Sequence, residues 1–168
     1  MHRKLAFLAA LVVSMPSVAG PTGPLPDVAA ATFDSLKGLV GEWRSDDAEH
    51  STLRIYFSLT AGGSVLVEEW KHDGRPHSLT LYHRDGAKLI ATHYCPQGNQ
   101  PRLQQIASSS ARTAKFQFLD AMDLDLSKEA HLIGLGFDLS DKTVIVRTET
   151  YRQKDVDEPS ELRLIRTR

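Results

Sequence analysis

The sequence predicts an all-β fold, a closed antiparallel up-and-down β-barrel of about ten strands with one short N-terminal helix. Three observations predict it. Segments of period-two alternation follow one another from residue 41 almost to the C-terminus, Gly- and Asp-containing turns separate them, and only one early segment has a helical period.

The helical segment runs from Ala29 to Leu39, where Phe33, Leu36 and Leu39 recur at three-to-four spacing. We expect this short helix to close one end of the barrel. The strand segments are Gly41 to Arg44, Leu53 to Leu59, Ser64 to Lys71, His77 to His83, Lys88 to Cys95, Arg102 to Ser108, Ala114 to Leu119, His131 to Leu139, Thr143 to Tyr151 and Leu162 to Thr167.

Hairpin turn chemistry joins several of these segments, as at His72-Asp73-Gly74, Arg84-Asp85-Gly86 and Ser140-Asp141-Lys142. So many short strands with so little helix leave a sandwich or a barrel. An immunoglobulin-like sandwich is not indicated, because the Cys and Trp spacing of such domains is missing.

The N-terminus has the features of an export signal. Met1-His2-Arg3-Lys4 is basic, Leu5 to Val13 is apolar, and Ser17-Val18-Ala19 supplies small residues for a signal peptidase. We therefore expect residues 1–19 to be a signal peptide, residues 20–28 a flexible leader and residues 29–168 one barrel domain, exported to the periplasm or secreted. The single cysteine, Cys95, excludes an intramolecular disulfide.

Composition narrows the possible partners. The formal net charge is -1, so no sustained basic surface is available for nucleic acid, which we exclude as a partner. No stretch of the mature chain reaches the roughly 20 apolar residues that a transmembrane helix needs. A small molecule remains the expected partner.

Gly41-Glu42-Trp43 opens the first strand, and Arg166 lies on the last one. In an antiparallel barrel these strands meet, and Arg166 can lie across the Trp43 indole in a cation–π contact. This pattern resembles the lipocalin and fatty-acid-binding barrels. The resemblance implies that Trp43 plugs the closed end of the barrel, that Arg166 staples the last strand to the first, and that the fold is a container for a small molecule.

A second resemblance rests on Thr92-His93-Tyr94-Cys95 and Gly98-Asn99-Gln100-Pro101-Arg102. Together with Ala61-Gly62-Gly63-Ser64 these motifs resemble a family of uncharacterised, secreted bacterial lipocalin-like (calycin-type) proteins, over residues 33 to about 139. The resemblance implies a barrel and no settled activity. Asn99 and Pro101 are expected to have structural roles, Asn99 by closing an Asx turn and Pro101 by holding Gln100 extended.

The hairpin around Asp85-Gly86 supplies candidate ligand contacts. A two-residue loop there would pair Arg84 with Ala87 and Ser78 with His93. One face then carries Ser78, Thr80, Tyr82, Leu89, Ala91, His93 and Cys95. The opposite face is more apolar, but the small residues of the first leave room for a ligand, so we assign the first face to the lumen.

The candidate ligand-binding residues are Tyr82, His93, Thr80, Ser78, Arg102 and Arg147. Arg102 could enter the barrel mouth and pair with an anionic group, and Arg147 is a second candidate. Glu68 and Glu69 are adjacent in a strand, so one must point inward and could neutralise one of these arginines.

The function predicted is binding of a small apolar or amphiphilic molecule. The alternatives are a barrel enzyme or haem protein that uses His93, and a ligand-free structural or interaction module. A buried His93 hydrogen-bonded to Tyr82 or Ser78 is the plainer interpretation of that residue. We assign no catalytic residue, because Cys95 and His93 lack an orienting carboxylate, and no metal site, because no metal-binding motif occurs.

Overall fold

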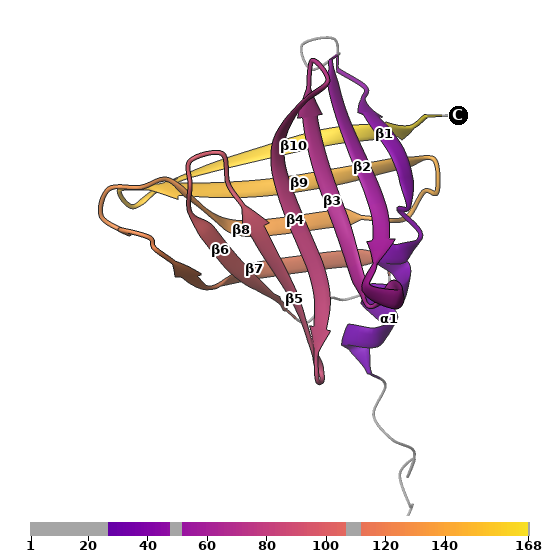
Figure 1. Ribbon diagram of the computed structural model, residues 1–168, viewed down its shortest axis with the longest axis horizontal. Coiled ribbons are helices and arrows are strands. Elements are labelled where there is room, and N and C mark those ends of the chain that lie inside the picture. Colours follow the sequence, from indigo (N-terminus) through magenta and orange to yellow (C-terminus); the bar gives the residue numbers. More distant parts are fainter. Residues whose placement is uncertain (1–26, 48–51, 107–111, 168) are drawn as a thin grey trace, which may run out of the picture.

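The computed structural model describes residues 27–47, 52–106 and 112–167, so the predicted signal peptide lies outside the described residues. The described chain forms one helix, ten strands and a single 3₁₀ turn (Figure 1). They are α1 (Val28–Lys37), β1 (Gly41–Ser45), β2 (Leu53–Thr60), β3 (Val65–His72), β4 (Arg75–Asp85), β5 (Lys88–Tyr94), β6 (Gln100–Gln105), β7 (Thr113–Met122), β8 (His131–Asp138), β9 (Val144–Gln153) and β10 (Val156–Arg166), with the 3₁₀ turn at Ala61–Gly63.

The ten strands close into one antiparallel barrel in sequence order, and β1 pairs with β10 to complete it. The predicted fold class is therefore confirmed. The closing contact is short and joins Trp43 with Arg166, Arg44 with Ile165 and Ser45 with Leu164. In Figure 1, strands β2 to β4 lie in front and cross the direction of β7 to β10 behind them.

Helix α1 covers one end of the barrel. It begins because the Asp27 carboxylate accepts a hydrogen bond from the Ala30 amide at 2.9 Å, an N-cap. Its buried residues Phe33 and Leu36 pack on the barrel core. The side-chain amide of Gln105 also donates a hydrogen bond to the Thr32 hydroxyl at 2.7 Å. No helix of the described chain is long and apolar enough to cross a membrane.

Aromatic side chains fill much of the barrel interior. The Tyr82 ring centroid lies 5.7 Å from that of Phe116 and 6.0 Å from that of Phe137, and Phe57 contacts Phe137 at 6.3 Å. Pairs at such separations contribute about 0.5–1.5 kcal/mol beyond the burial of their area. The interior is thus a packed core over much of its length.

The β4–β5 hairpin corrects the predicted register by two residues. Asp85 pairs with Lys88 and Thr80 with His93, so the loop is Gly86-Ala87 and not Asp85-Gly86. Gly86, at the first loop position, has φ 59°, which glycine adopts without strain. A shift of two residues keeps each side chain on its face. The face with Thr80 and His93 is buried, and the prediction that it points inward is confirmed.

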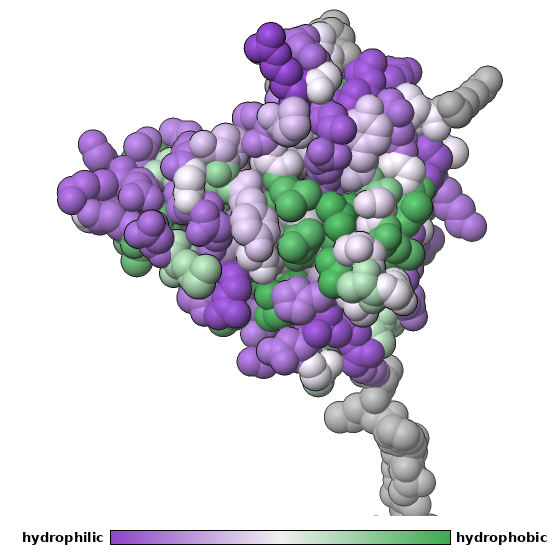
Figure 2. Space-filling model, viewed as in Figure 1, coloured by the Kyte–Doolittle hydropathy of each residue, from purple (hydrophilic) through white to green (hydrophobic). Residues whose placement is uncertain are grey.

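The more apolar face of the same hairpin lies outside. Val67 of β3 and Leu81 of β4 pair across the outer surface, next to Leu79, and all three are half-buried. Figure 2 shows hydrophobic residues gathered in the middle of this face, over the strands that Figure 1 labels β2 to β4. Binary patterning alone would have placed this face in the core.

Strand β10 is longer than predicted. It begins at Val156 and not at Leu162, and it pairs with β9 over its whole length. Pro159 and several acidic residues hid the extension. Proline is tolerated there because β1 pairs only with residues 164–166, which leaves the Pro159 side of β10 as an edge.

Candidate functional site

Trp43 forms the floor of the closed end. Its side chain is fully buried, and its indole Nε1 donates to the Leu39 carbonyl at 2.7 Å. The Arg166 guanidinium carbon lies 4.3 Å from the centroid of the Trp43 ring, so the predicted cation–π contact is present. The two residues also face each other across the β1–β10 pairing.

Arg166 ties three chain segments together. Its guanidinium donates to the carbonyls of Gly38 at 2.7 Å, Val40 at 2.8 Å and Lys142 at 3.3 Å. The predicted structural role of Gly41 follows from the same contact. Gly41 has φ 133°, and a Cβ atom placed on it would lie 2.9 Å from an Arg166 nitrogen. Glycine therefore permits the approach of Arg166.

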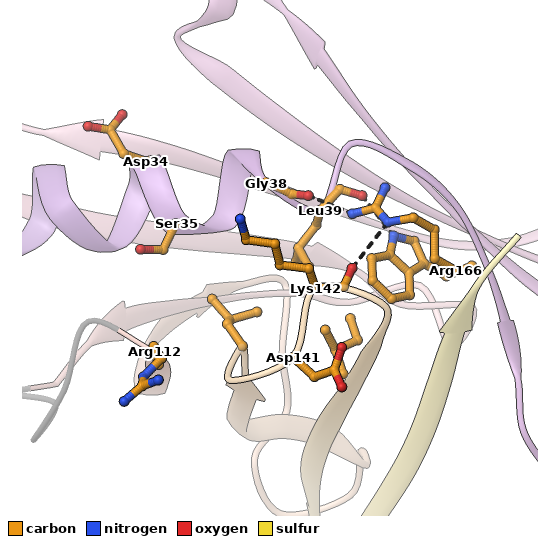
Figure 3. Close-up of a pocket in the computed structure, with 11 residues that line it drawn as sticks. Asp34, Ser35, Gly38, Leu39, Arg112, Asp141, Lys142 and Arg166 are labelled. Carbon is orange, nitrogen blue, oxygen red and sulfur yellow. Dashed lines mark hydrogen bonds between the residues drawn. The ribbon is translucent and has the colours of Figure 1, made fainter. Parts of the chain in front are cut away.

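The segments that Arg166 joins line a groove of about 570 Å³ at the closed end of the barrel, between α1 and the β8–β9 turn (Figure 3). We call it the base groove. Its floor is apolar and consists of Leu39, Trp43, Leu139 and Ile145. Its polar lining consists of Asp34, Ser35, Gly38, Arg112, Asp141, Lys142 and Arg166. This volume lies within the range of about 300–1,000 Å³ that is typical of ligand pockets.

The carboxylates of the base groove already have partners. Asp34 pairs with Lys37 at 3.0 Å. Asp141 accepts hydrogen bonds from the amide and hydroxyl of Thr143 at 2.7 and 2.8 Å, which lower the pKa of Asp141. The Lys142 ammonium, by contrast, forms no ion pair or side-chain hydrogen bond with the described chain. Figure 3 shows its side chain extending toward α1.

A second polar group of residues lies inside the barrel. We call it the interior cluster, formed by Glu68, Thr80, Tyr82, His93, Arg147, Glu149 and Tyr151. Arg147 Nε lies 2.6 Å from a Glu68 oxygen, and Nη1 lies 2.7 Å from a Glu149 oxygen. The prediction that an inward Glu neutralises an arginine is therefore confirmed for Glu68 and Arg147.

Glu68 also accepts hydrogen bonds from the Tyr82 hydroxyl and, at 2.6 Å, from Trp70 Nε1. The Arg147 guanidinium lies over the Trp70 ring at 4.5 Å. The Arg147 nitrogens lie close to the carboxylates of Glu68 and Glu149. Even so, none of these nitrogens has an acceptor in hydrogen-bond geometry among the described residues. Arg147 is thus held by charge and by ring contact.

His93 uses both ring nitrogens within the cluster. Nδ1 lies 2.9 Å from the Thr80 hydroxyl and Nε2 lies 3.1 Å from the Tyr151 hydroxyl. The predicted partners Ser78 and Tyr82 are therefore wrong, and the two-residue register shift explains why Thr80 takes the place of Ser78. Burial lowers the pKa of His93 to about 4. The imidazole is neutral near pH 7.

Burial and charge fix the ionisation of the other cluster members. Burial, and next the Glu68 carboxylate, raise the pKa of Tyr82 well above its ordinary value. Burial also raises the pKa of Tyr151, with further contributions from Glu149 and Cys95. For Arg147 burial acts in the opposite direction, but the carboxylates of Glu149 and Glu68 outweigh it and raise the pKa. Both tyrosines are neutral and Arg147 is charged.

Arg102 lies on the outer surface of the barrel. It forms a two-pronged ion pair with Asp120 of the neighbouring strand, with Nε 2.6 Å from the carboxylate. The prediction that Arg102 enters the barrel mouth is therefore wrong. Side chains alternate along β6, so Pro101 and Leu103 take the inward positions and Arg102 between them points outward.

The loop before β6 agrees with the prediction at Gly98 and differs from it at Asn99. Gly98 has the expected positive φ, 98°. The Asn99 side chain is buried and donates to the Ala130 carbonyl at 3.0 Å, so it links this loop to the segment before β8 and does not close the predicted Asx turn. Pro101 is buried in β6, and Ser78 is half-buried beside Trp70.

Sequence reasoning missed two kinds of residue. Tyr151 could have been found, because it continues the inward alternation of Ile145, Arg147 and Glu149 along β9. Lys142 was noted only as a turn residue. The lining of the base groove comes from five separate segments of the chain, and no local sequence signal joins them.

Neither His93 nor Tyr82 lines any of five pockets on the described part of the chain. Within residues 27–47, 52–106 and 112–167 there is also no group of three or more potential metal ligands. Of the two polar sites, the base groove has open volume, whereas the interior cluster consists of side chains that contact one another.

Comparison with known proteins supports the fold alone. No protein-family model matches the chain, and no curated protein sequence matches it significantly. The crystal structure of Rv2717c from M. tuberculosis superposes with a TM-score of 0.52 at 15% sequence identity, over 82% of this chain and 98% of that one. At this identity the two proteins share a barrel architecture, and no site residue is transferred.

Proposed function

We propose that this protein is an exported binding protein for a small apolar or amphiphilic molecule, and that the base groove holds the ligand. The observation that carries the proposal is the groove of about 570 Å³ with its apolar floor. Burying about 200 Å² of apolar ligand surface there contributes roughly 5 kcal/mol before the entropy cost of association.

The base groove is a better candidate than the predicted lumen. A container needs free volume beside its polar groups, and the interior around Tyr82 is occupied by Phe116 and Phe137. Glu68 and Arg147 already neutralise each other, so neither charge needs a ligand as its partner. The ligand-binding role of Ser78, Thr80, Tyr82, His93 and Arg147 remains a prediction.

The haem or enzyme alternative finds less support in the geometry. Iron ligation or proton transfer by His93 would require one of its nitrogens to leave Thr80 or Tyr151. Cys95 is buried, so its thiol is poorly accessible to a substrate. The ligand-free module is tested directly by the experiment below.

Binding is tested with phenylnaphthylamine, a neutral fluorophore whose emission rises in apolar surroundings. We expect saturable binding at about one molecule per folded chain. Ser35→Trp places a large side chain in the groove and should weaken binding at least about tenfold, because it fills the volume that the probe needs.

Two control variants locate the site. Ala31→Trp adds the same side chain to an exposed position of α1 that does not line the groove, and should leave binding unchanged. His93→Phe alters the interior cluster and should also leave binding unchanged in folded protein. Loss of binding in His93→Phe with full binding in Ser35→Trp would place the ligand in the lumen and refute the groove proposal. No saturable binding in any variant would favour the ligand-free module.

Export is tested separately. Expression of the full chain in a bacterial host, followed by cell fractionation and N-terminal sequencing, should give a periplasmic or secreted product that begins at Gly20. A cytoplasmic product that retains Met1 would refute this part of the proposal.

A further inference from the structure

We infer that the ligand of the base groove carries an anionic group, such as a carboxylate or sulfonate, on an apolar body. This inference rests on the proposed function and names the chemical class of the ligand. It replaces Arg102, which the structure places on the outer surface, with Lys142 as the residue that recognises negative charge.

The charges around the groove favour an anion. Three cationic side chains line it, Arg112, Lys142 and Arg166, against the two carboxylates of Asp34 and Asp141. Asp34 is paired with Lys37, which does not line the groove, and the Asp141 carboxylate accepts hydrogen bonds from Thr143, so neither carboxylate forms an ion pair with Lys142 among the described residues. Lys142 is the cation whose ammonium is left for a ligand to neutralise.

The carbonyl groups at the end of α1 do not cancel this preference. A helix C-terminus carries partial negative charge, which would repel an anion. Here the Arg166 guanidinium donates to the carbonyls of Gly38 and Val40, and so supplies positive charge at that end. The same guanidinium holds the Lys142 carbonyl and thereby fixes the turn from which the Lys142 side chain extends.

The two parts of the groove would orient such a ligand. Leu39, Leu139 and Ile145 offer apolar surface, while Lys142 lies at the rim and extends toward α1 (Figure 3). An amphiphile can bury its apolar body on this floor and keep its charged group at the rim, in contact with the ammonium. A partly desolvated charge-assisted hydrogen bond is stronger than one between neutral groups.

The test compares two probes with the same aromatic skeleton. Anilinonaphthalene sulfonate carries one negative charge, and phenylnaphthylamine lacks it. We expect the sulfonate to bind the folded protein about tenfold more tightly at low salt, with this preference reduced in high salt because the ions screen the Lys142 charge. Decanoate should displace both probes, and decyltrimethylammonium should displace them poorly.

Lys142→Gln provides the decisive comparison. It should reduce the preference for the sulfonate to less than about threefold and leave phenylnaphthylamine affinity unchanged, because the apolar floor is intact. Lys154→Gln, a charge removal at the β9–β10 turn, is the matched control and should preserve the preference.

The outcomes separate this inference from the proposed function. Equal affinity for the two probes, or a preference that survives Lys142→Gln, would overturn the anionic ligand while small-molecule binding in the groove still stands. Binding of the sulfonate that Ser35→Trp does not weaken would overturn both. Circular dichroism of each variant establishes that the folded protein is being compared.

Discussion

The guanidinium of Arg166 lies 4.3 Å from the centre of the Trp43 ring and donates hydrogen bonds to Gly38, Val40 and Lys142. One side chain from the last strand thus joins the end of α1, the entry to β1 and the β8–β9 turn. These are also the segments that enclose the base groove, so the shape of the groove depends on this contact.

Replacing Trp43 should destabilise the barrel strongly. Trp43→Ala removes a fully buried side chain and leaves a cavity beneath Arg166, for which we expect a loss of about 3–5 kcal/mol in the free energy of unfolding. Denaturant titration measures it. Arg163→Ala, which removes an exposed ion pair between β10 and Asp46 at the end of β1, should cost less than about 1 kcal/mol. Equal losses would show that Trp43 is not a structural plug.

Gly41 should tolerate substitution less well than a turn glycine. Gly74→Ala places a Cβ atom at φ 74° with no neighbour within 4 Å, so it should cost roughly 1–2 kcal/mol in backbone strain alone. Gly41→Ala adds a close contact with Arg166 to unfavourable φ, and we expect roughly 2–5 kcal/mol. Thermal and denaturant unfolding compare the two, and similar losses would contradict the contact.

The buried pair of Glu68 and Arg147 should show strong coupling. Arg147→Met leaves the Glu68 carboxylate buried without its cation, and should cost about 3–5 kcal/mol. The double variant Glu68→Gln with Arg147→Met should cost clearly less than the sum of the single variants. The exposed ion pair of Arg152 with Asp157 is the control, and Arg152→Met should change stability by less than about 1 kcal/mol. Additive losses at Glu68 and Arg147 would argue against a coupled pair.

His93 should make stability depend on acidity. Its pKa is 6.5 when unperturbed and about 4 in the folded protein, because burial opposes the charged form. Between these values the unfolded chain binds the extra proton. The contribution of His93 to the free energy of unfolding is therefore fully present above pH 6.5. It falls by a few kcal/mol as the pH drops toward about 4.

Urea unfolding of the parent and of His93→Gln across this pH range measures the effect. The parent should lose more stability than the variant on acidification, since glutamine does not titrate. NMR titration of the His93 ring should show a neutral imidazole down to about pH 5. Parallel pH profiles for the two proteins would contradict the assignment.

Local patterns were enough to predict the strands. Nine of the ten strand segments were placed close to their observed ends, because alternation and turn residues act over a few positions. Strand β10 was the exception, since Pro159 and the acidic residues near it mask a strand that pairing with β9 stabilises. The parity of alternation also placed Thr80 and His93 on the same face, even though the β4–β5 register was shifted by two residues.

The partners of the site residues were decided by tertiary structure. Alternation fixes which face a side chain occupies, but not which strand lies opposite across the barrel. Thus His93 meets Tyr151, far away in the sequence, and Arg147 meets Glu68. Arg102 points outward in keeping with the alternation of β6, and its partner Asp120 comes from the neighbouring strand β7.

The sequence by itself determined the strand pattern, the grouping of Thr80, Tyr82 and His93 on one face of β4 and β5, and the meeting of Trp43 with Arg166, because these depend on local alternation and on the closure of the barrel between its first and last strands. Tertiary structure alone decided that aromatic rings occupy the interior around Tyr82 and that the open volume lies outside the closed end. The physical reason is that a groove depends on how the side chains of distant segments pack, and packing volume has no signature within any one segment.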